Sequence, residues 1–171
     1  MKQLTTRKIV LTALLTALVT VFTMFVRIPL PLGYVNLGDA FIFLAVFLLG
    51  PVLGTIAGGI GSCIADIIGY ITYAPGTLVI KSLMAIVTWA IYTLVKKLTR
   101  LELVAEIVGG IIGSIIMAVG YFVYEILFFV SAGVAIVNLP WNILQGVVGV
   151  TVSVVVMRIL FAVKIVDKIR D

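Results

Sequence analysis

Two residues of opposite charge, Asp66 and Lys81, lie inside apolar stretches where charges are rare. Asp66 is near the end of the stretch 51–71, and Lys81 is near the start of the stretch 77–95. If both stretches are antiparallel membrane helices, the two charges lie at about the same depth and near the same face. A charged side chain at such depth is costly and commonly marks a functional site. We therefore predict that both residues belong to the mouth of a solute pocket.

Plainer interpretations of these charges remain open at this point. Asp66 is also explained as a structural carboxylate that pairs with Lys81 or with a hydroxyl group. Lys81 is also explained as a side chain that snorkels to the membrane interface. A further carboxylate, Asp39, stands just before an apolar run, where an N-cap role would account for it.

Small and polar residues recur at four-residue spacing on two of the expected helices. Residues four apart share one face of a helix, and a face of small residues packs against protein rather than lipid. One such face ends at Asp66, and the other ends at a third carboxylate, Glu125. The two series are Gly54, Gly58, Ser62 and Asp66, and Gly109, Gly113, Met117, Tyr121 and Glu125.

The composition identifies the environment of these helices. The chain of 171 residues is 63% hydrophobic and 11% charged, whereas soluble domains are about 45–50% apolar and about 25% charged. Because a transmembrane helix needs about 20 apolar residues, the chain has room for about six spans and no separate soluble domain. The sequence therefore predicts an all-α integral membrane protein, a single domain over residues 1–171 built as a compact bundle of about six transmembrane helices.

The expected spans differ in length. The second is too short to cross a bilayer upright. The first follows a basic start that resembles a signal peptide, but it has no clear small-residue cleavage site, so we interpret it as a retained helix. The spans are predicted at 9–26, 40–49, 51–71, 77–95, 103–130 and 140–163.

The segment 27–39 between the first two spans is predicted to fold over the protein as a lid. Pro29, Pro31 and its glycines prevent a regular helix. The segment nevertheless stays apolar, with Tyr34 and Asn36 interleaved. A freely solvated linker would be more polar.

The basic residues predict the orientation. With the N-terminus in the cytoplasm, ten of the twelve basic residues fall on the inner side, and Arg27 and Lys81 are the two exceptions. This asymmetry agrees with the positive-inside rule and places both termini in the cytoplasm. The same threading leaves the inner half with almost no buried polarity, unlike the continuous polar lining of a channel. The outer half gathers Asp39, Asp66, Lys81, Glu125, Asn138, Asn142 and Gln145, with loops that carry Tyr34, Asn36, Tyr70 and Tyr73.

Several motifs carry a resemblance to a known family. They are the small-residue step from Ala13 to Ala17, the run VNLGD over 35–39, the turn GPVLG over 50–54, Asp66, and the run APGTLVIK over 74–81. With these motifs, the chain resembles the substrate-binding S-component of energy-coupling factor (ECF) vitamin transporters, in the riboflavin- and pyridoxine-type branch. The resemblance covers nearly the whole chain.

The resemblance implies a function. An S-component binds a water-soluble vitamin at the extracellular side of a bacterial cell membrane, and it is thought to topple in the bilayer to deliver it. It docks through the alanine motif, here Ala13 and Ala17, on a membrane coupling subunit that carries two ATPases. The chain itself would then be no enzyme, with no catalytic residue, cofactor, metal or nucleic-acid partner. By position, the resemblance implies a pocket of Lys81, Glu125 and Asn142, joined by Asp66, Tyr34, Asn36, Tyr73 and Gln145.

The expected cargo is pyridoxine or a hydroxymethylpyrimidine, because Lys81, Glu125 and Asn142 suit a small heteroaromatic ring with hydroxyls or ring nitrogens. Riboflavin would need a larger, aromatic-lined cavity, and pantothenate would place its carboxylate on Lys81. Binding titrations with these four compounds would distinguish them.

Two other classes of protein were weighed. A structural membrane subunit of a cell-shape or assembly complex would explain the packing motifs, but it gives no reason for the polar residues to converge. A small intramembrane enzyme is disfavoured because the chain has no histidine and a single cysteine, Cys63, which therefore lacks a histidine partner for nucleophilic catalysis. A His/Cys metal site is disfavoured for the same reason.

Overall fold

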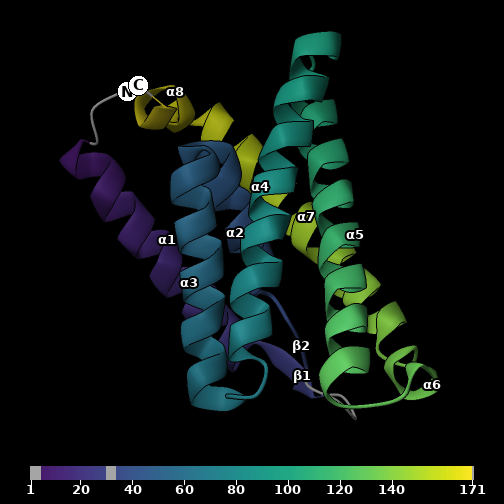
Figure 1. The fold of residues 1–171 in the computed structure, drawn as a ribbon. Coiled ribbons are helices and arrows are strands. Elements are labelled where there is room, and N and C mark those ends of the chain that lie inside the picture. Colours follow the sequence, from purple (N-terminus) through teal and green to yellow (C-terminus); the bar gives the residue numbers. More distant parts are fainter. Residues whose placement is uncertain (1–4, 30–33, 171) are drawn as a thin grey trace.

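The computed structural model describes residues 5–29 and 34–170, and these form a bundle of helices with one small hairpin (Figure 1). In chain order the elements are α1 (Thr6–Phe25), β1 (Arg27–Pro29), β2 (Tyr34–Asn36), α2 (Gly38–Leu49), α3 (Pro51–Gly69), α4 (Ala74–Thr99), α5 (Glu102–Phe128), α6 (Ala132–Ala135), α7 (Leu139–Ala162) and α8 (Ile165–Arg170).

The predicted all-α membrane bundle is confirmed, with one change in the number of spans. Within the described residues, five helical stretches are long and apolar enough to cross a membrane: α1, α3, α4, α5 and the stretch Ala132–Ala162 that contains α7. The outer faces of these stretches carry exposed apolar side chains, such as Ile67, Val79, Ile115 and Val147, that suit contact with lipid. The remaining expected span is α2, whose 12 residues extend only about 18 Å at 1.5 Å per residue.

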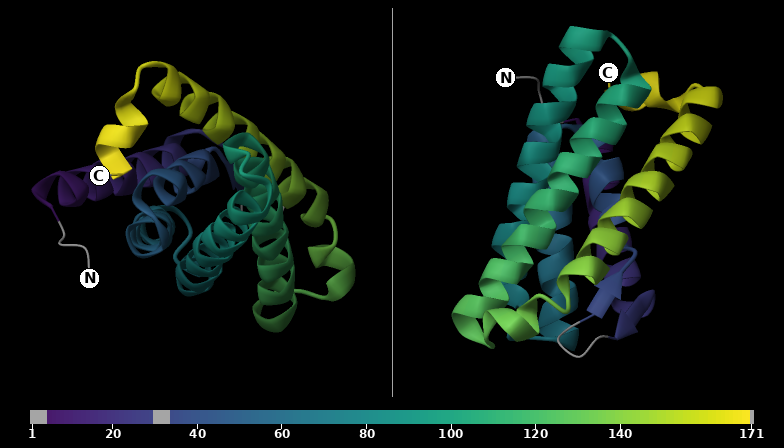
Figure 2. Two further views of the ribbon diagram at one scale, coloured as in Figure 1. Left: turned by 90° about the horizontal axis from the view of Figure 1, so that it is seen from above. Right: turned by 90° about the vertical axis from the view of Figure 1, so that its right-hand side faces the viewer.

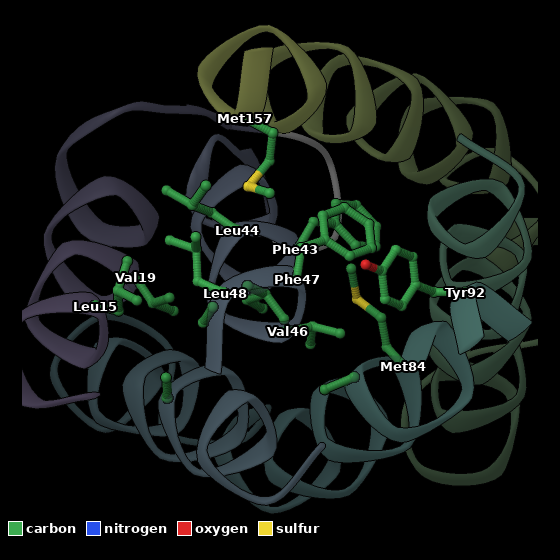
Figure 3. Packing of buried hydrophobic residues seen from close by; sticks show 14 of the residues in the cluster. Leu15, Val19, Phe43, Leu44, Val46, Phe47, Leu48, Met84, Tyr92 and Met157 are labelled. Carbon is green, nitrogen blue, oxygen red and sulfur yellow. The ribbon is translucent and has the colours of Figure 1, made fainter. Parts of the chain in front are cut away.

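The short helix α2 forms the centre of the bundle. Almost every residue from Gly38 to Leu48 is buried, which fits a helix that is apolar on all sides. Figure 3 shows its side chains, among them Phe43 and Phe47, enclosed by residues of the surrounding helices. The neighbours include Leu15 and Val19 of α1, Met84 and Tyr92 of α4, and Met157 of α7.

Close helix contacts occur where the sequence places glycines. A Cβ atom on Gly54 would lie 2.7 Å from the Cα of Val46 in α2, and one on Gly58 would lie 2.7 Å from the side chain of Ile42. The small-residue face of α3 therefore packs against protein, as predicted. The corresponding face of α5 packs on α4, where a Cβ on Gly109 would lie 2.9 Å from the carbonyl oxygen of Thr88.

The two ends of the bundle carry different elements. The start of α1, the turn between α4 and α5, and α8 lie at one end, whereas the hairpin and α6 lie at the other (Figure 1). Figure 2 shows the same separation of the hairpin from α8 from a second direction. The side of the membrane that each end faces stays a prediction from the basic residues. For brevity, we call the hairpin end the outer end and the α8 end the inner end.

The hairpin is the described part of the expected lid. β1 and β2 pair antiparallel, with Arg27 opposite Asn36 and Pro29 opposite Tyr34. Leu37 then leads directly into α2. Pro31 and Gly33 of the predicted lid lie outside the described residues.

The inner end differs from the sequence expectation in two ways. First, the fully buried carboxylate of Glu106 on α5 pairs with Arg158 on α7, so the prediction of almost no buried polarity there is wrong. Second, the expected basic tail forms α8, whose Val166 and Ile169 are buried against the core. These contacts close the bundle beneath α2.

Candidate binding site

A cavity at the outer end collects the polar residues that the sequence singled out. All eight predicted site residues line it, although they come from five separate segments of the chain. The lining consists of Thr23, Tyr34, Asn36, Ser62, Asp66, Tyr73, Thr77, Lys81, Tyr121, Glu125, Asn138, Asn142 and Gln145. Their common depth follows from the antiparallel arrangement of the helices, as expected, while their role in binding stays a prediction.

A buried ion pair underlies one side of this cavity. Lys81 pairs with Asp39, and the two residues are only 2% and 1% exposed. The ammonium group of Lys81 also lies 5.4 Å from the ring centroid of Tyr121, within the range of a cation–π contact. Two of the plainer interpretations are therefore wrong: Lys81 does not pair with Asp66, and its side chain does not extend to the membrane interface.

Asp39 is not an N-cap. It lies inside the first turn of α2, whose N-cap is Leu37 with no side-chain capping bond. Both of its carboxylate oxygens are engaged instead, one by Lys81 and the other by the amide group of Gln145, which donates at 2.7 Å. The carboxylate therefore holds two lining side chains in place from behind the cavity.

Gln145 links this ion pair to the hairpin. While its amide nitrogen donates to Asp39, its amide oxygen accepts a hydrogen bond from the backbone N–H of Asn36 at 2.8 Å. The position of β2 is therefore tied to the buried pair through one side chain of α7.

A second tie joins the hairpin to α3. The phenol of Tyr34 donates a hydrogen bond to Asp66, and the guanidinium of Arg27 lies 5.2 Å from the centroid of the Tyr34 ring. Burial raises the pKa of the Tyr34 phenol above its ordinary value, and the neighbouring charge of Asp66 adds to this rise. The phenol therefore stays protonated at neutral pH and acts as the donor. Of the alternatives for Asp66, pairing with a hydroxyl is the one observed.

Glu125 is held on the opposite side of the cavity. Its Oε1 accepts hydrogen bonds from the amide of Asn138 at 3.1 Å and from the phenol of Tyr73 at 3.3 Å. Nearby, the hydroxyls of Thr77 and Tyr121 bond at 2.9 Å. Burial raises the pKa of the Tyr73 phenol, and the charge of Glu125 raises it further, so Tyr73 also donates at neutral pH.

Aromatic rings connect these polar groups around the mouth. Tyr34 lies 5.4 Å from Tyr70 and Tyr73 lies 6.4 Å from Tyr121, measured between ring centroids. Phe129 stacks on Tyr73 at 5.1 Å. These distances are typical of interacting aromatic pairs, and three of the rings, Tyr34, Tyr73 and Tyr121, line the cavity.

The cavity is closed down around its own side chains. The space not filled by atoms, counted together with the open mouth, is about 470 Å³. However, only about 30 Å³ is open to the centre of a water molecule, enough for about two waters. A vitamin can therefore enter only when some lining side chains move.

Sequence reasoning missed several members of the site. The supporting role of Asp39 behind the cavity was missed, because an N-cap explained this carboxylate. Thr77 and Tyr121 each lie one helical turn from a chosen residue, Lys81 and Glu125 respectively, so the four-residue spacing could have identified them. Asn138 precedes α7 and gave a weaker signal, since its role depends on a contact across the cavity.

A separate apolar groove lies on the outside of the bundle, between α1 and α3. Both predicted interface residues, Ala13 and Ala17, line this groove, which has a volume of about 660 Å³. Their small side chains are exposed and leave room for another helix to approach. The groove is lined further by Ile9, Thr12, Thr16, Thr20, Val21, Leu53, Ile56 and Ile64.

The fold and the cavity define a class: a helical membrane protein with a polar-lined cavity at one end of a bundle whose centre is filled. Comparison with known families identifies the group, because the family model of the ECF-type riboflavin transporter S component matches residues 3–162. The chain belongs to this family. It is therefore a multi-pass membrane protein that binds a vitamin as the substrate-specificity subunit of an ECF importer, works with the membrane and ATPase subunits of an ECF module, and is not itself an enzyme.

Two individual proteins illustrate the similarity. An "uncharacterized protein in gap 3'region" of Pyrococcus woesei is 37% identical over 137 residues, which covers 79% of this chain and 88% of that protein. A solved structure described as the S component of a bacterial ECF transporter superposes with a TM-score of 0.69, covering 91% of this chain and 96% of that one. At 22% identity, this second likeness supports the fold.

Proposed function

We propose that the vitamin bound by this chain is riboflavin, which the S-component captures at the outer end and delivers into the cell. The description of the matching family names riboflavin transport. The observation that carries the proposal is the aromatic lining, because Tyr34, Tyr73 and Tyr121 border one cavity. Riboflavin needs an aromatic-lined cavity, which these rings supply, and it also needs a larger one, which requires the lining side chains to move apart.

The polar groups suit the two halves of riboflavin. Its flat ring system has an edge with one N–H donor and two carbonyl acceptors, and the amides of Asn138, Asn142 and Gln145 can offer partners of both kinds. Its sugar-like chain carries hydroxyl groups that can donate to carboxylates. Asp66 and Glu125 border the cavity and supply such acceptors.

Pyridoxine or a hydroxymethylpyrimidine is the second candidate. One observation favours these smaller molecules: only about 30 Å³ of the cavity is open to the centre of a water molecule. A small ring needs less rearrangement of the tyrosines than riboflavin does. The polar groups are the same for both candidates, since each has a heteroaromatic ring and hydroxyl groups.

Pantothenate fits less well than the sequence alone suggested. That assignment required Lys81 to receive a carboxylate, but Lys81 is already paired with Asp39. Two further carboxylates, Asp66 and Glu125, line the cavity and would repel a negatively charged ligand. The site therefore favours uncharged vitamins.

The proposed delivery uses the groove between α1 and α3 as the docking surface for the membrane coupling subunit. Ala13 and Ala17, the predicted interface residues, are among the residues that line it. The proposal includes a topology with both termini in the cytoplasm. It also includes location in a bacterial cell membrane. The alternative is the cell membrane of an organism such as Pyrococcus woesei, which has a similar protein.

Direct titration tests the cargo. The purified full chain in detergent is titrated with riboflavin, pyridoxine, hydroxymethylpyrimidine and pantothenate by calorimetry, with quenching of flavin fluorescence as a second signal for riboflavin. We expect tight binding and quenching with riboflavin, because its ring would stack among tyrosines. Tight binding of pyridoxine alone would transfer the assignment to the second candidate, and binding of none would contradict a vitamin site among these residues.

A further inference from the structure

One acceptor atom in the cavity has no partner among the described residues. Glu125 is 2% exposed and lines the cavity, and its Oε2 accepts no hydrogen bond from any of them. Its other oxygen, Oε1, receives two donors, from Asn138 and Tyr73. The carboxylate is therefore fixed in orientation by one oxygen and leaves the second unmatched.

A second unmatched group lies on another wall of the same cavity. The hydroxyl of Ser62 on α3 is buried, and no partner for it occurs among the residues that the structure describes. Asp39 presents the contrast, since both of its oxygens are engaged by protein groups. Unmatched buried atoms also occur elsewhere among the described residues, for example on Thr55 and Thr88. The distinguishing feature of Glu125 and Ser62 is therefore that both line the cavity.

An unmatched buried acceptor is unfavourable, and more so when it carries charge. Buried polar groups in folded proteins are nearly always paired. An exception that borders a ligand cavity has a direct explanation when the ligand supplies the missing partner. For Oε2 of Glu125 that partner must be a donor, such as a hydroxyl or a ring N–H.

We propose that Glu125 anchors the vitamin by accepting a hydrogen bond at Oε2, and that Ser62 contributes the opposing contact. Asn138 and Tyr73 are the positioning residues, because their hydrogen bonds to Oε1 hold the carboxylate and leave Oε2 for the ligand. The site therefore requires a ligand that bears a donor at the matching place and rejects an analogue that lacks it. This inference rests on the proposed function and specifies which chemical group of the vitamin is recognised.

The first experiment removes donors from the ligand. Riboflavin is compared with lumiflavin, which keeps the ring but lacks the hydroxyl chain, and with 3-methylriboflavin, which lacks the ring N–H. Fluorescence titrations use the purified full chain, Glu125→Gln, and Glu102→Gln as a control for the same change at the inner end. Replacing the acceptor by an amide donor should weaken riboflavin binding roughly 10- to 100-fold, with Glu102→Gln unchanged.

The analogues identify which donor reaches Oε2. We expect one of them to bind the unaltered protein roughly 10- to 100-fold more weakly than riboflavin, and to lose little further affinity in Glu125→Gln. Equal binding of riboflavin by the unaltered protein and Glu125→Gln would overturn the proposal. The proposal would also be overturned if Glu125→Gln lowered the affinity for riboflavin and for both analogues by the same factor.

A second measurement separates this proposal from the choice of vitamin. Without ligand, Glu125→Gln should melt at the same temperature as the unaltered protein or higher, because it removes a buried, unmatched charge. A purely structural role for Glu125 predicts a lower melting temperature instead.

If riboflavin does not bind, the same comparison is made with pyridoxine and 4-deoxypyridoxine. If Glu125→Gln then lowers the affinity for pyridoxine alone, the anchor is supported and riboflavin is rejected as the cargo. A lower melting temperature together with unselective binding would reject the anchor itself.

Discussion

The pair formed by Lys81 and Asp39 places a full positive and a full negative charge where almost no water reaches them. Such a pair adds little net stability compared with apolar residues of the same size, but losing one member leaves an uncompensated buried charge. Its value lies in holding Lys81 and Gln145, which both border the cavity. We therefore expect the pair to determine part of the geometry of the proposed binding site.

The first prediction separates these two roles. Lys81→Met should destabilise the protein by about 3–5 kcal/mol, because Asp39 is left unpaired. Adding Asp39→Asn to it should recover most of that loss, since the new amide side chain carries no charge. Riboflavin binding should stay weak in both variants because the support of the cavity wall is gone.

Thermal unfolding in detergent measures the stability part of this prediction, and fluorescence titration measures the binding part. A double variant less stable than Lys81→Met alone would contradict the account of an uncompensated charge. Full binding in the double variant would show that the pair has no part in the site.

At this scale the sequence predicted positions better than partners. All eight chosen residues border the cavity, because helical spacing and antiparallel connection determine depth. The pairing was beyond reach, since Lys81 and Asp39 are separated by 42 positions. Their contact depends on how α2 packs beside α4, and no pattern within a short stretch of sequence predicts that packing.

The hairpin contributes Tyr34 and Asn36 to the lining of the cavity, and we expect it to act as the lid. Two bonds from its second strand reach the interior, one from the side chain of Tyr34 to Asp66 and one from the backbone of Asn36 to Gln145. Its pairing with β1 covers only three residue pairs, and an isolated hairpin of this kind is marginally stable. The interior bonds are therefore expected to determine how long it stays closed.

The second prediction concerns this closure. Tyr34→Phe removes a hydrogen bond to a carboxylate, worth about 1.5–3 kcal/mol, so the hairpin should open more often. Hydrogen exchange of residues 34–37 should speed up, and riboflavin should dissociate faster. Tyr70→Phe is the control, because it alters a neighbouring ring of the same cluster. Unchanged exchange in Tyr34→Phe would mean that other contacts hold the hairpin.

The third prediction concerns the seat of α2. Gly54→Ala places a methyl group 2.7 Å from the Cα of Val46, so α2 and α3 must separate, at a cost of about 1–3 kcal/mol. The melting temperature should fall. Gly133→Ala, where a Cβ would meet nothing within 4 Å, should leave it unchanged, and a similar fall in both variants would contradict the packing explanation.

The lengths of the helices could be predicted from the sequence, but the way in which they pack against one another could not. Glycine and proline at positions 50 and 51 correctly separated α2 from α3. In the structure, α2 is buried on all sides and is therefore central. The sequence could not show this, because a run of apolar residues is equally typical of a helix that faces lipid. The helix α8 was missed because Val166 and Ile169 stand among charged residues.

Over the whole molecule, polar and apolar recognition occupy different surfaces. The cavity at the outer end collects the groups that suit a vitamin, while the groove between α1 and α3 offers mostly apolar atoms and small residues. Binding of the cargo and docking on the coupling subunit should therefore be separable by mutation.

The fourth prediction tests that separation. Ala17→Leu fills part of the groove, so the chain should no longer co-purify with the coupling subunit and its ATPases, while riboflavin binding in detergent stays within a few-fold of normal. Ala90→Leu makes the same change on the exposed side of α4 and serves as the control. Loss of vitamin binding in Ala17→Leu would contradict the separation of the two surfaces.

The filled axis of the bundle has a consequence for release. Beneath the cavity, α2 and the aromatic and aliphatic side chains around it form a plug about 18 Å deep, measured along the 12 residues of that helix. Within the described part of the chain, the side chains of this helix and those packed around it are mainly aliphatic and aromatic, such as Phe43, Phe47 and Met84. We therefore expect the vitamin to leave through the same outer opening by which it entered, so that this opening has to be brought to the cytosolic side for delivery.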